Sequence, residues 1–192
     1  MAIEASDTRG RLISGAAELI MRGGYKGFSY GDLSKRFGLR GPSIHHHFPA
    51  KSDLVVAAVE QSREGLRAHA ALLEPGVPAM EQLRAYTGYW ERCIGDQTAP
   101  FCLAGVLAAE LPSLPPEVAT AVRGHFAELT GWLERVLTLG VEQGVMRLEG
   151  KPRLEAETLT AGVYGAMLAA RAFDDPKRFS LIVEPFIRRI TA

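Results

Sequence analysis

The chain has 192 residues, 47% of them hydrophobic, and its 22 basic and 22 acidic side chains leave a formal net charge of zero. This length predicts one or two folded domains with a sizeable buried core. Zero net charge argues against nucleic-acid binding over the whole surface. The charge is unevenly distributed, however, because residues 1–55 contain eight Lys and Arg against five Asp and Glu. The bias indicates a discrete phosphate-contacting module in this part of the chain, or alternatively ordinary scatter.

The cysteine content and the lack of targeting patterns bear on the cellular compartment of the protein. Residues 1–7 are polar and no apolar run follows them, so we expect no signal peptide. No apolar run approaches the roughly 18 residues that a membrane-spanning helix needs. Cys93 and Cys102 are the only cysteines, too few for a disulfide framework in a chain of this length. These features predict a cytoplasmic protein without a membrane span.

The segment SYGDLSKRFGLRGPSIHHHFPAK, residues 29–51, has the pattern of two short helices joined by a turn. Ser29 followed by Asp32 resembles a capping box at the start of the first helix, with Asp in place of Glu. Gly38 is suited to the left-handed turn that ends this helix. Gly41 is expected to cap the second helix, and Pro42 suits its first helical position because proline lacks the amide proton that would be unpaired there.

The second helix should bury one face and expose the other. Ile44 and Phe48 lie four residues apart and point inward together, and Pro49 stops the helix after about two turns. The exposed face carries only small or polar side chains, with no acidic group to repel phosphate: Pro42, Ser43, His45 and His46. Two short helices joined by a glycine-containing turn form the helix-turn-helix motif of DNA-binding proteins. Two packed structural helices would show the same apolar spacing.

The segment from Thr8 to Leu54 resembles the DNA-binding domain of the TetR family of bacterial repressors. The matching pieces are TRGRLISGAAELIMRGGYKGFS, YGDLSKRFGLRGPSIHHHF and PAKSDL, which cover about a quarter of the chain. Two positions depart from the family pattern. His45 stands where the family usually has Tyr, which puts one phosphate contact in doubt. Ala50 replaces a usual Ser before Lys51, which removes a helix cap worth about 1 kcal/mol.

This resemblance implies that the protein binds double-stranded operator DNA through the N-terminal segment. The residues expected at the DNA are Arg9, Ser29, Tyr30, Arg40, Gly41, Pro42, Ser43, His45, His46 and Lys51. Lys51 is a strong candidate because it begins the next helix, whose dipole also favours an anion. Arg9 lies in the first helix, and its alternative role is plain solvated charge.

Three adjacent histidines, His45 to His47, raise the question of a metal site. Neighbouring residues on a helix point about 100° apart, whereas metal-binding pairs on helices are usually three or four residues apart. We therefore expect no metal here, and no cofactor elsewhere. We expect His47 to pack beneath the helix, as the family's His does, with His45 facing phosphate and His46 facing the groove edge.

The remainder of the chain is expected to be helical, since no alternating strand pattern occurs. Apolar periodicity and Pro or Gly breaks predict helices at about 51–73, 79–94, 101–111, 115–144, 154–173 and 177–190. The predicted fold class is all-α, with about nine helices in total. The resemblance to the TetR family implies a three-helix DNA-binding domain at residues 1–54, followed by a helical bundle at residues 55–192 that is expected to bind a ligand and to dimerise.

The predicted helix at 154–173 is unusually rich in Ala and Gly. Small residues allow helices to approach closely, so with the last helix it could form half of a four-helix bundle across a two-fold axis. The resemblance implies the same, because TetR-like repressors form homodimers through their last helices. The alternative is a helix buried within one chain.

Aromatic and polarizable residues gather in the C-terminal helical region. In the TetR family this region encloses a pocket for a small-molecule inducer, and such sites are mostly apolar with a few polar anchors. The residues expected to bind the inducer are Tyr86, Tyr89, Trp90, Cys93, Cys102, Phe126, Tyr164, Met167 and Arg171. Each of them is alternatively an ordinary core residue.

Cys102 lies in the stretch PFCLAGVLAAEL, which resembles a segment in one branch of TetR-like repressors. Some members of that branch sense reactive electrophiles or oxidants through this cysteine. A thiol acts as a sensor only where its thiolate is favoured and reachable. No cation adjoins Cys102 in the sequence, and Phe101 and Leu103 indicate an apolar setting, so inert burial is the alternative.

The sequence as a whole predicts a DNA-binding transcriptional regulator, in its simplest form a dimeric repressor released from its operator by an inducer. A cysteine-based electrophile or redox sensor is one alternative. The other is an all-helical small-molecule enzyme. The chain lacks a glycine-rich phosphate loop, a serine elbow, metal-ligand spacing and a paired-carboxylate signature, and we therefore expect no enzymatic activity.

Overall fold

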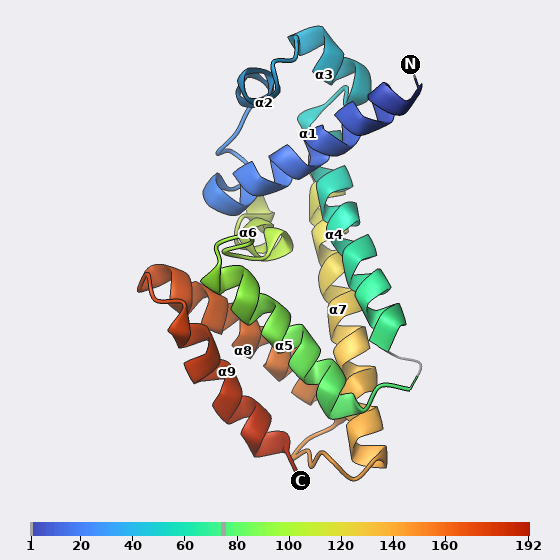
Figure 1. Cartoon of the computed structure of the whole chain (residues 1–192), viewed down its shortest axis with the longest axis vertical. Helices are drawn as coiled ribbons and strands as arrows, with labels where there is room; N and C mark the ends of the chain where they lie inside the picture. The colour runs from blue at the N-terminus through green and yellow to red at the C-terminus, as the bar shows by residue number, and fades with distance from the viewer. Residues whose placement is uncertain (1, 74–75) are drawn as a thin grey trace. The chain divides into compact units, whose positions relative to one another are not determined.

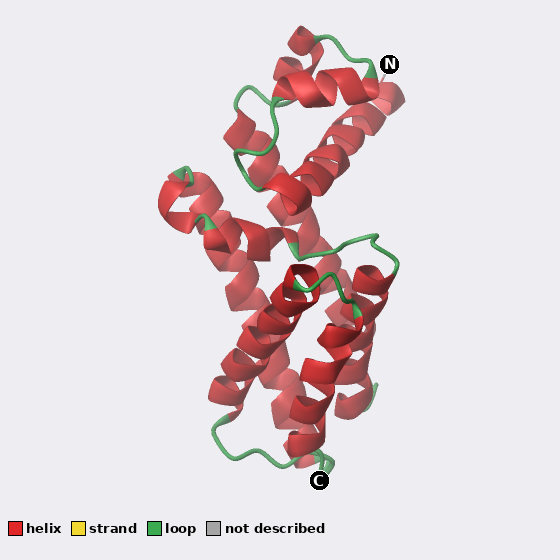
Figure 2. Cartoon of the chain, turned by 90° about the vertical axis from the view of Figure 1, so that its left-hand side faces the viewer, coloured by secondary structure: helices red, strands yellow, loops and turns green. Residues whose placement is uncertain are grey.

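The computed structural model describes residues 2–73 and 76–192, with side chains from residue 8 onward. Within these residues every regular element is helical apart from one isolated bridge between Met146 and Thr191 (Figure 2). The helices are α1 (Ala2–Gly23), α2 (Tyr30–Phe37), α3 (Gly41–His47), α4 (Lys51–Leu73), α5 (Ala79–Gly95), α6 (Leu103–Ala109), α7 (Pro116–Glu142), α8 (Pro152–Ala172) and α9 (Lys177–Ile190), with a 3-10 turn, η1 (Leu111–Ser113), before α7 (Figure 1). The all-α prediction is confirmed.

The chain packs into two compact units. The first contains residues 1–64 and 103–125, and the second contains residues 65–102 and 126–192. The long helices α4 and α7 each contribute one half to each unit. None of the described helices is both long and apolar enough to cross a membrane.

The first unit is built around α1, α2, α3 and the start of α4. Its core consists of fully buried apolar side chains, among them Leu12, Ala16, Ile20, Leu33, Ile44, Leu54 and Val55. The predicted capping box at the start of α2 is confirmed, because the Ser29 amide donates to Asp32 Oδ2 at 2.7 Å and the Asp32 amide donates to Ser29 Oγ at 3.3 Å. The Ser29 hydroxyl, which also donates to Asp32 Oδ2 at 2.7 Å, and the Ser29 amide hold the pKa of the Asp32 carboxylate below its usual value.

Three helix starts in the first unit show details that the sequence did not predict. Arg40 caps α3 with extended backbone, so Gly41 and Pro42 occupy its first two helical positions. This geometry also suits proline, whose missing amide proton has no partner at either position. The helix α1 begins at Ala2, ahead of the segment from Thr8 onward that resembles the family's DNA-binding domain. At α4, the Ala50 amide donates to Asp53 Oδ2 at 2.9 Å, which keeps half of the capping box that the missing Ser would complete.

A left-handed residue ends both α1 and α2, as the glycine pattern predicts. Gly24 has φ +74° and Gly38 has φ +66°. The two positions differ in their surroundings. A Cβ on Gly38 would meet no atom within 4 Å, whereas a Cβ on Gly24 would lie 2.1 Å from Glu110 Oε1. The Glu110 carboxylate is held there because it accepts a 2.7 Å hydrogen bond from the Tyr25 amide.

The two glycines therefore form a matched pair for substitution. We expect Gly38→Ala to lower the free energy of unfolding by about 1–2 kcal/mol, the cost of the left-handed conformation. Gly24→Ala should cost about 1–3 kcal/mol more, because it also displaces Glu110 from the Tyr25 amide. Urea unfolding at one fixed protein concentration measures both. Equal losses in the two variants would show that the Glu110 contact adds nothing to stability.

The second unit is a helical bundle of α5, α8, α9 and the adjoining halves of α4 and α7. The last two helices pack along each other, with Phe179, Val183 and Ile187 of α9 buried. An ion pair joins their ends, since Arg189 lies 2.9 Å from the buried carboxylate of Glu155. Because both helices bury one face here, the opposite faces remain available to solvent.

Candidate functional site

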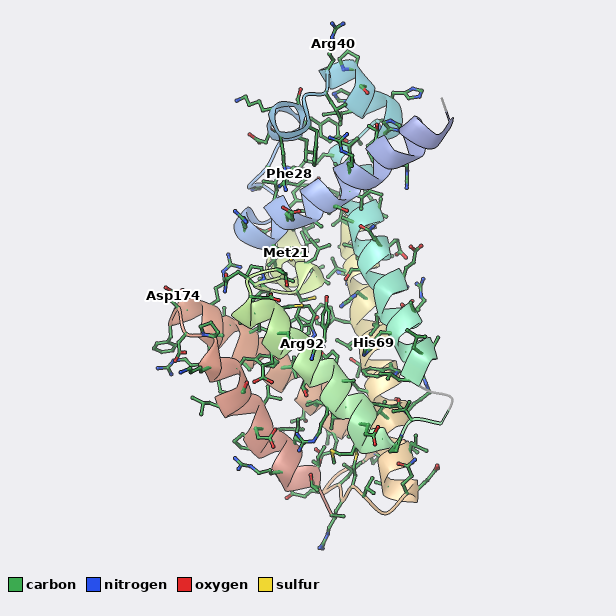
Figure 3. The ribbon with its side chains drawn as sticks, viewed as in Figure 1. Met21, Phe28, Arg40, His69, Arg92 and Asp174 are labelled. Atoms are coloured by element: carbon green, nitrogen blue, oxygen red, sulfur yellow. The ribbon has the colours of Figure 1, made fainter. Side chains whose placement is uncertain are left out.

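The helix α3 exposes the surface that a DNA-reading helix requires. Ile44 is fully buried and Phe48 is 2% exposed, so together they anchor the inner face. Pro42, His45 and His46 are exposed on the outer face, and Ser43 is half-buried. Arg40 is exposed at the start of the helix, and Figure 3 shows its side chain extending away from the unit. The exposed end of α3 is therefore uncharged to cationic.

Tyr30 fixes α2 against the end of α3. Its hydroxyl donates to the Phe48 carbonyl at 2.9 Å, and burial raises the pKa of Tyr30 to about 12, so the group stays a neutral donor. The ring of His45 meets the Tyr30 ring edge-on, with 4.9 Å between centroids. The His45 Nδ1 atom also lies 3.3 Å from the Pro49 carbonyl oxygen. His45 is thus held in place by its own unit although it faces solvent.

Lys51 is held by groups of its own unit. Its Nζ donates to the Phe28 carbonyl at 2.5 Å and lies over the rings of Phe28 and Tyr25, 4.2 and 4.7 Å from their centroids. Burial lowers the pKa of Lys51. An ammonium carries three N–H donors, and the Phe28 carbonyl uses one of them. Arg9 is also positioned by a ring, with its guanidinium 5.1 Å from the centroid of Phe48, but it remains exposed.

Cys102 lies in the second unit, within a group of aromatic side chains. It is 1% exposed, and the Tyr164 hydroxyl donates to its sulfur at 3.1 Å. The Tyr164 ring also contacts Phe126 and Phe101, with centroids 5.0 and 6.5 Å away. Burial raises the pKa of Tyr164 well above its usual value, so the phenol remains protonated at neutral pH.

A second aromatic group lies in the same unit, where α4, α5 and α7 meet. The Trp132 ring contacts Tyr86 and His69 edge-on, with centroids 5.6 and 6.4 Å away. Burial strongly raises the pKa of Tyr86, and the charge of an ionised Cys102 would raise it further. The Trp90 side chain acts in the opposite direction and lowers the pKa of Tyr86, although the Tyr86 hydroxyl has no hydrogen bond of normal geometry. Tyr86 thus links this group to Cys102.

Two family models match most of the chain. The model of the bacterial regulatory proteins of the tetR family matches residues 12–58, and the model of the tetracyclin repressor-like C-terminal domain matches residues 79–185. The chain belongs to the TetR family. It is a transcriptional regulator with an N-terminal DNA-binding domain and a C-terminal ligand-binding domain.

Individual TetR-family proteins agree with this assignment. A TetR-family regulator from Agrobacterium tumefaciens is 48% identical, with a TM-score of 0.95 over 98% of this chain and 100% of its own. The reduced form of Escherichia coli NemR shares the fold, with a TM-score of 0.83 over 96% of this chain and 97% of its own at 22% identity. The curated regulator CymR of Pseudomonas putida is 34% identical over 83 residues, and the match spans only 41% of each protein.

The structure brings together some of the sequence-predicted ligand residues of this TetR-family protein. Tyr164 contacts both Cys102 and Phe126, and an ionised Cys102 would raise the pKa of Tyr86. The remaining residues are divided between core and surface: Met167 is fully buried, Cys93 is 9% exposed, Tyr89 is 45% exposed, and Arg171 is exposed with its guanidinium 5.9 Å from the Phe101 centroid. Trp90 contacts the ring of Tyr89.

The sequence-predicted ligand residues do not include His69 or Trp132, whose rings the structure places in contact. His69 lies three residues after Leu66 and four before Leu73, which places it on the inner side of α4 by helical spacing. Among the described residues, no group of three His, Cys, Asp or Glu side chains is placed to bind a metal ion.

Proposed function

We propose that this protein is a homodimeric repressor that leaves its operator when a small molecule binds in the C-terminal helical domain. Residues 1–54 are assigned to DNA binding, and residues 55–192 to ligand binding and dimerisation. The observation that carries the proposal is the outer face of α3. His45 and His46 are exposed there, and no acidic residue occurs between Arg40 and Lys51.

The DNA contacts are assigned to groups on and around α3. Pro42, Ser43 and His46 would meet the groove, since the side chains of a recognition helix read base edges. Phosphates would be met by Arg9, Arg40, His45, Lys51 and the backbone of Gly41. Ser29 and Tyr30 would position the motif at the DNA, because their hydroxyls already donate to Asp32 and Phe48. The hydrogen bond of Tyr30 to α3 supports this assignment, because it fixes the angle between the two helices of the motif.

Dimerisation is assigned to the solvent-facing sides of α8 and α9. One row of exposed residues on α8 follows a heptad spacing: Leu154, Thr158, Ala161, Gly165, Leu168 and Ala172. Leu154 and Leu168, 59% and 60% exposed, lie in this row with small residues and Thr158 between them, so they belong to one exposed surface. The small residues between them allow a partner helix to approach closely. Leu181 of α9, 68% exposed, extends the same kind of surface. A two-fold axis would pair these faces with themselves.

Release of DNA follows from the spacing that two recognition helices require. The two half-site readers of a helix-turn-helix dimer must lie about 34–36 Å apart to enter successive major grooves. A ligand that binds better to a dimer with a different spacing lowers the affinity for operator by the same coupling free energy. The buried group around Cys102, Tyr164 and Tyr86 is the proposed ligand site.

Fluorescence polarisation with the DNA upstream of the protein's own gene tests the proposal. We expect tight binding that depends on sequence and weakens steeply with salt, because phosphate contacts release counterions. A scrambled duplex of the same length is the control. Equal affinity for the two duplexes would rule out an operator-binding repressor. A thermal-shift screen of small hydrophobic and electrophilic compounds then identifies ligands whose binding raises the melting temperature.

A second candidate function, thiol-based sensing, rests on the contact between Tyr164 and Cys102. The phenol hydrogen bond is suited to stabilise a thiolate, but the sulfur is nearly inaccessible at 1% exposure, and sensing cysteines are usually reachable. We therefore expect N-ethylmaleimide to leave operator affinity unchanged in the native dimer. A loss of affinity that Cys102→Ser prevents, and Cys93→Ser does not, would establish sensing through Cys102.

A further inference from the structure

Five buried side-chain polar atoms of the second unit have no hydrogen-bond partner among the described residues, and three of them lie on rings that are in contact. These three are His69 Nε2 on α4, Tyr86 Oη on α5 and Trp132 Nε1 on α7. The three rings contact each other, with Trp132 between the other two at centroid distances of 6.4 and 5.6 Å. Trp132 is 1% exposed and Tyr86 is 5% exposed. Figure 3 shows His69 on the half of α4 that belongs to this unit.

Buried polar groups in folded proteins nearly always have partners, since an unpaired one costs about 1–3 kcal/mol. Three such atoms on touching rings therefore indicate a site that another molecule completes. The indole N–H of Trp132 can only donate, and the Tyr86 hydroxyl is kept protonated by burial, so it can also donate. The group that pairs with the Trp132 indole must therefore be a hydrogen-bond acceptor, and Tyr86 can donate to the same group.

The surroundings of these rings also define the charge of the partner. None of the rings of Tyr86, Trp132 and His69 carries a permanent charge. The nearby Arg67 and Glu128 already form an ion pair with each other at 2.9 Å on the surface. A buried carboxylate would have to pair with a protonated His69, and burying both charges costs several kcal/mol of desolvation. An ammonium group could lie over the aromatic faces, but it cannot accept a hydrogen bond from Trp132.

We propose that the ligand of this domain is an uncharged aromatic molecule with an oxygen acceptor, such as an aryl ketone or aldehyde. Its oxygen accepts from Trp132 Nε1, with Tyr86 and His69 beside it. The inference rests on the proposed ligand-binding function and adds His69 and Trp132 to the site. It concerns binding alone and makes no assumption about which DNA is released.

The chain has only two tryptophans, so its indole N–H groups can be followed individually by NMR in the full-length protein. Four probes share one ring: acetophenone, ethylbenzene, benzoate and phenyltrimethylammonium. We expect acetophenone to move the Trp132 indole proton downfield and to bind about five- to tenfold more tightly than ethylbenzene, the value of one hydrogen bond. Benzoate and phenyltrimethylammonium should leave the resonance unmoved. Trp90→Phe assigns the two resonances.

Variants test the same contact by affinity. Trp132→Phe keeps an aromatic ring and removes the donor, so acetophenone should bind it no better than ethylbenzene. Tyr86→Phe removes one hydroxyl and provides a second measurement if the first variant unfolds. The inference is overturned if neither neutral probe binds up to its solubility limit, if the two bind equally to the wild type, or if a charged probe binds more tightly.

The outcomes separate this inference from the proposed function. If acetophenone binds at Trp132 but does not weaken DNA binding in the polarisation assay, the ligand class stands and the release mechanism fails. If other compounds release DNA without moving the Trp132 resonance, release stands and this ligand site is wrong.

Discussion

Replacing His46 with glutamate is expected to abolish operator binding without unfolding the protein. His46 is exposed on the outer face of α3, so the new carboxylate has room and the core formed by Ile44 and Phe48 is untouched. In the complex the same carboxylate would face the acceptor-rich groove and phosphates. We expect the affinity to fall by about 100-fold or more, since like-charge contacts at an interface cost several kcal/mol.

The matched control for this variant is Gln61→Glu, which adds one negative charge at an exposed position of α4 in the same unit. It should change operator affinity only slightly at moderate salt, because exposed charges farther apart than about 8–10 Å are screened. Polarisation measures both variants, and circular dichroism checks that they are folded. If His46→Glu bound as tightly as Gln61→Glu, the outer face of α3 would not be the DNA-reading surface.

Leu168→Glu is expected to split the proposed dimer. Leu168 is 60% exposed in the single chain, and small residues flank it on the outer face of α8. The stability of one chain should change little, because the side chain has no buried position to lose. In a two-fold dimer, each interface would contain two unpaired carboxylates. We expect the dimer dissociation constant to rise by about 100-fold or more, and operator affinity to fall with it because both half-site readers are needed.

Leu72→Glu is the control for the dimer variant. Leu72 is 78% exposed near the end of α4, so the substitution makes the same chemical change outside the proposed interface. Sedimentation velocity over a concentration series measures the assembly of both variants. If Leu168→Glu remained dimeric at the concentrations at which the wild type is dimeric, the outer faces of α8 and α9 would not be the interface.

Much of the fold followed from local sequence signals. Proline and glycine positions, together with apolar spacing, placed α4 and α9 with the bounds that the structure shows, and α5 and α8 within two residues. The capping box at Ser29 and the left-handed Gly38 were also predicted correctly. These features depend on hydrogen bonds and backbone angles within a few residues, so a short stretch of sequence contains the interactions that decide them.

The predicted start of α3 was wrong by one residue, because two neighbouring positions can begin this helix equally well. An extended Arg40 and a helical Gly41 satisfy the start of α3 as well as the predicted arrangement, because Pro42 tolerates either of the first two positions. The predicted 101–111 helix is instead α6 followed by η1, since Pro112 has no amide proton to continue the α-helical ladder. The one-residue shift in the start of α3 does not change the DNA-binding prediction, because both arrangements expose the same face of the helix.

The ligand site shows the limit of residue-by-residue reasoning. Aromatic composition predicted a C-terminal pocket, and Tyr164 contacts two other residues of that prediction, Cys102 and Phe126. The composition could not show that Tyr89 is 45% exposed, or that His69 of one helix touches Trp132 of another. Those two residues are 63 positions apart in the chain.

The sequence by itself determined the helical elements, the helix-turn-helix and the family to which the chain is similar, because these rest on local periodicity, caps and motif spacing. Only the tertiary structure decided which polar atoms are left without partners, how Lys51 and Tyr30 are already engaged, and which leucines of α8 remain in solvent. These properties depend on helix packing between distant segments, where one residue's burial is set by side chains that its own neighbourhood in the sequence does not contain.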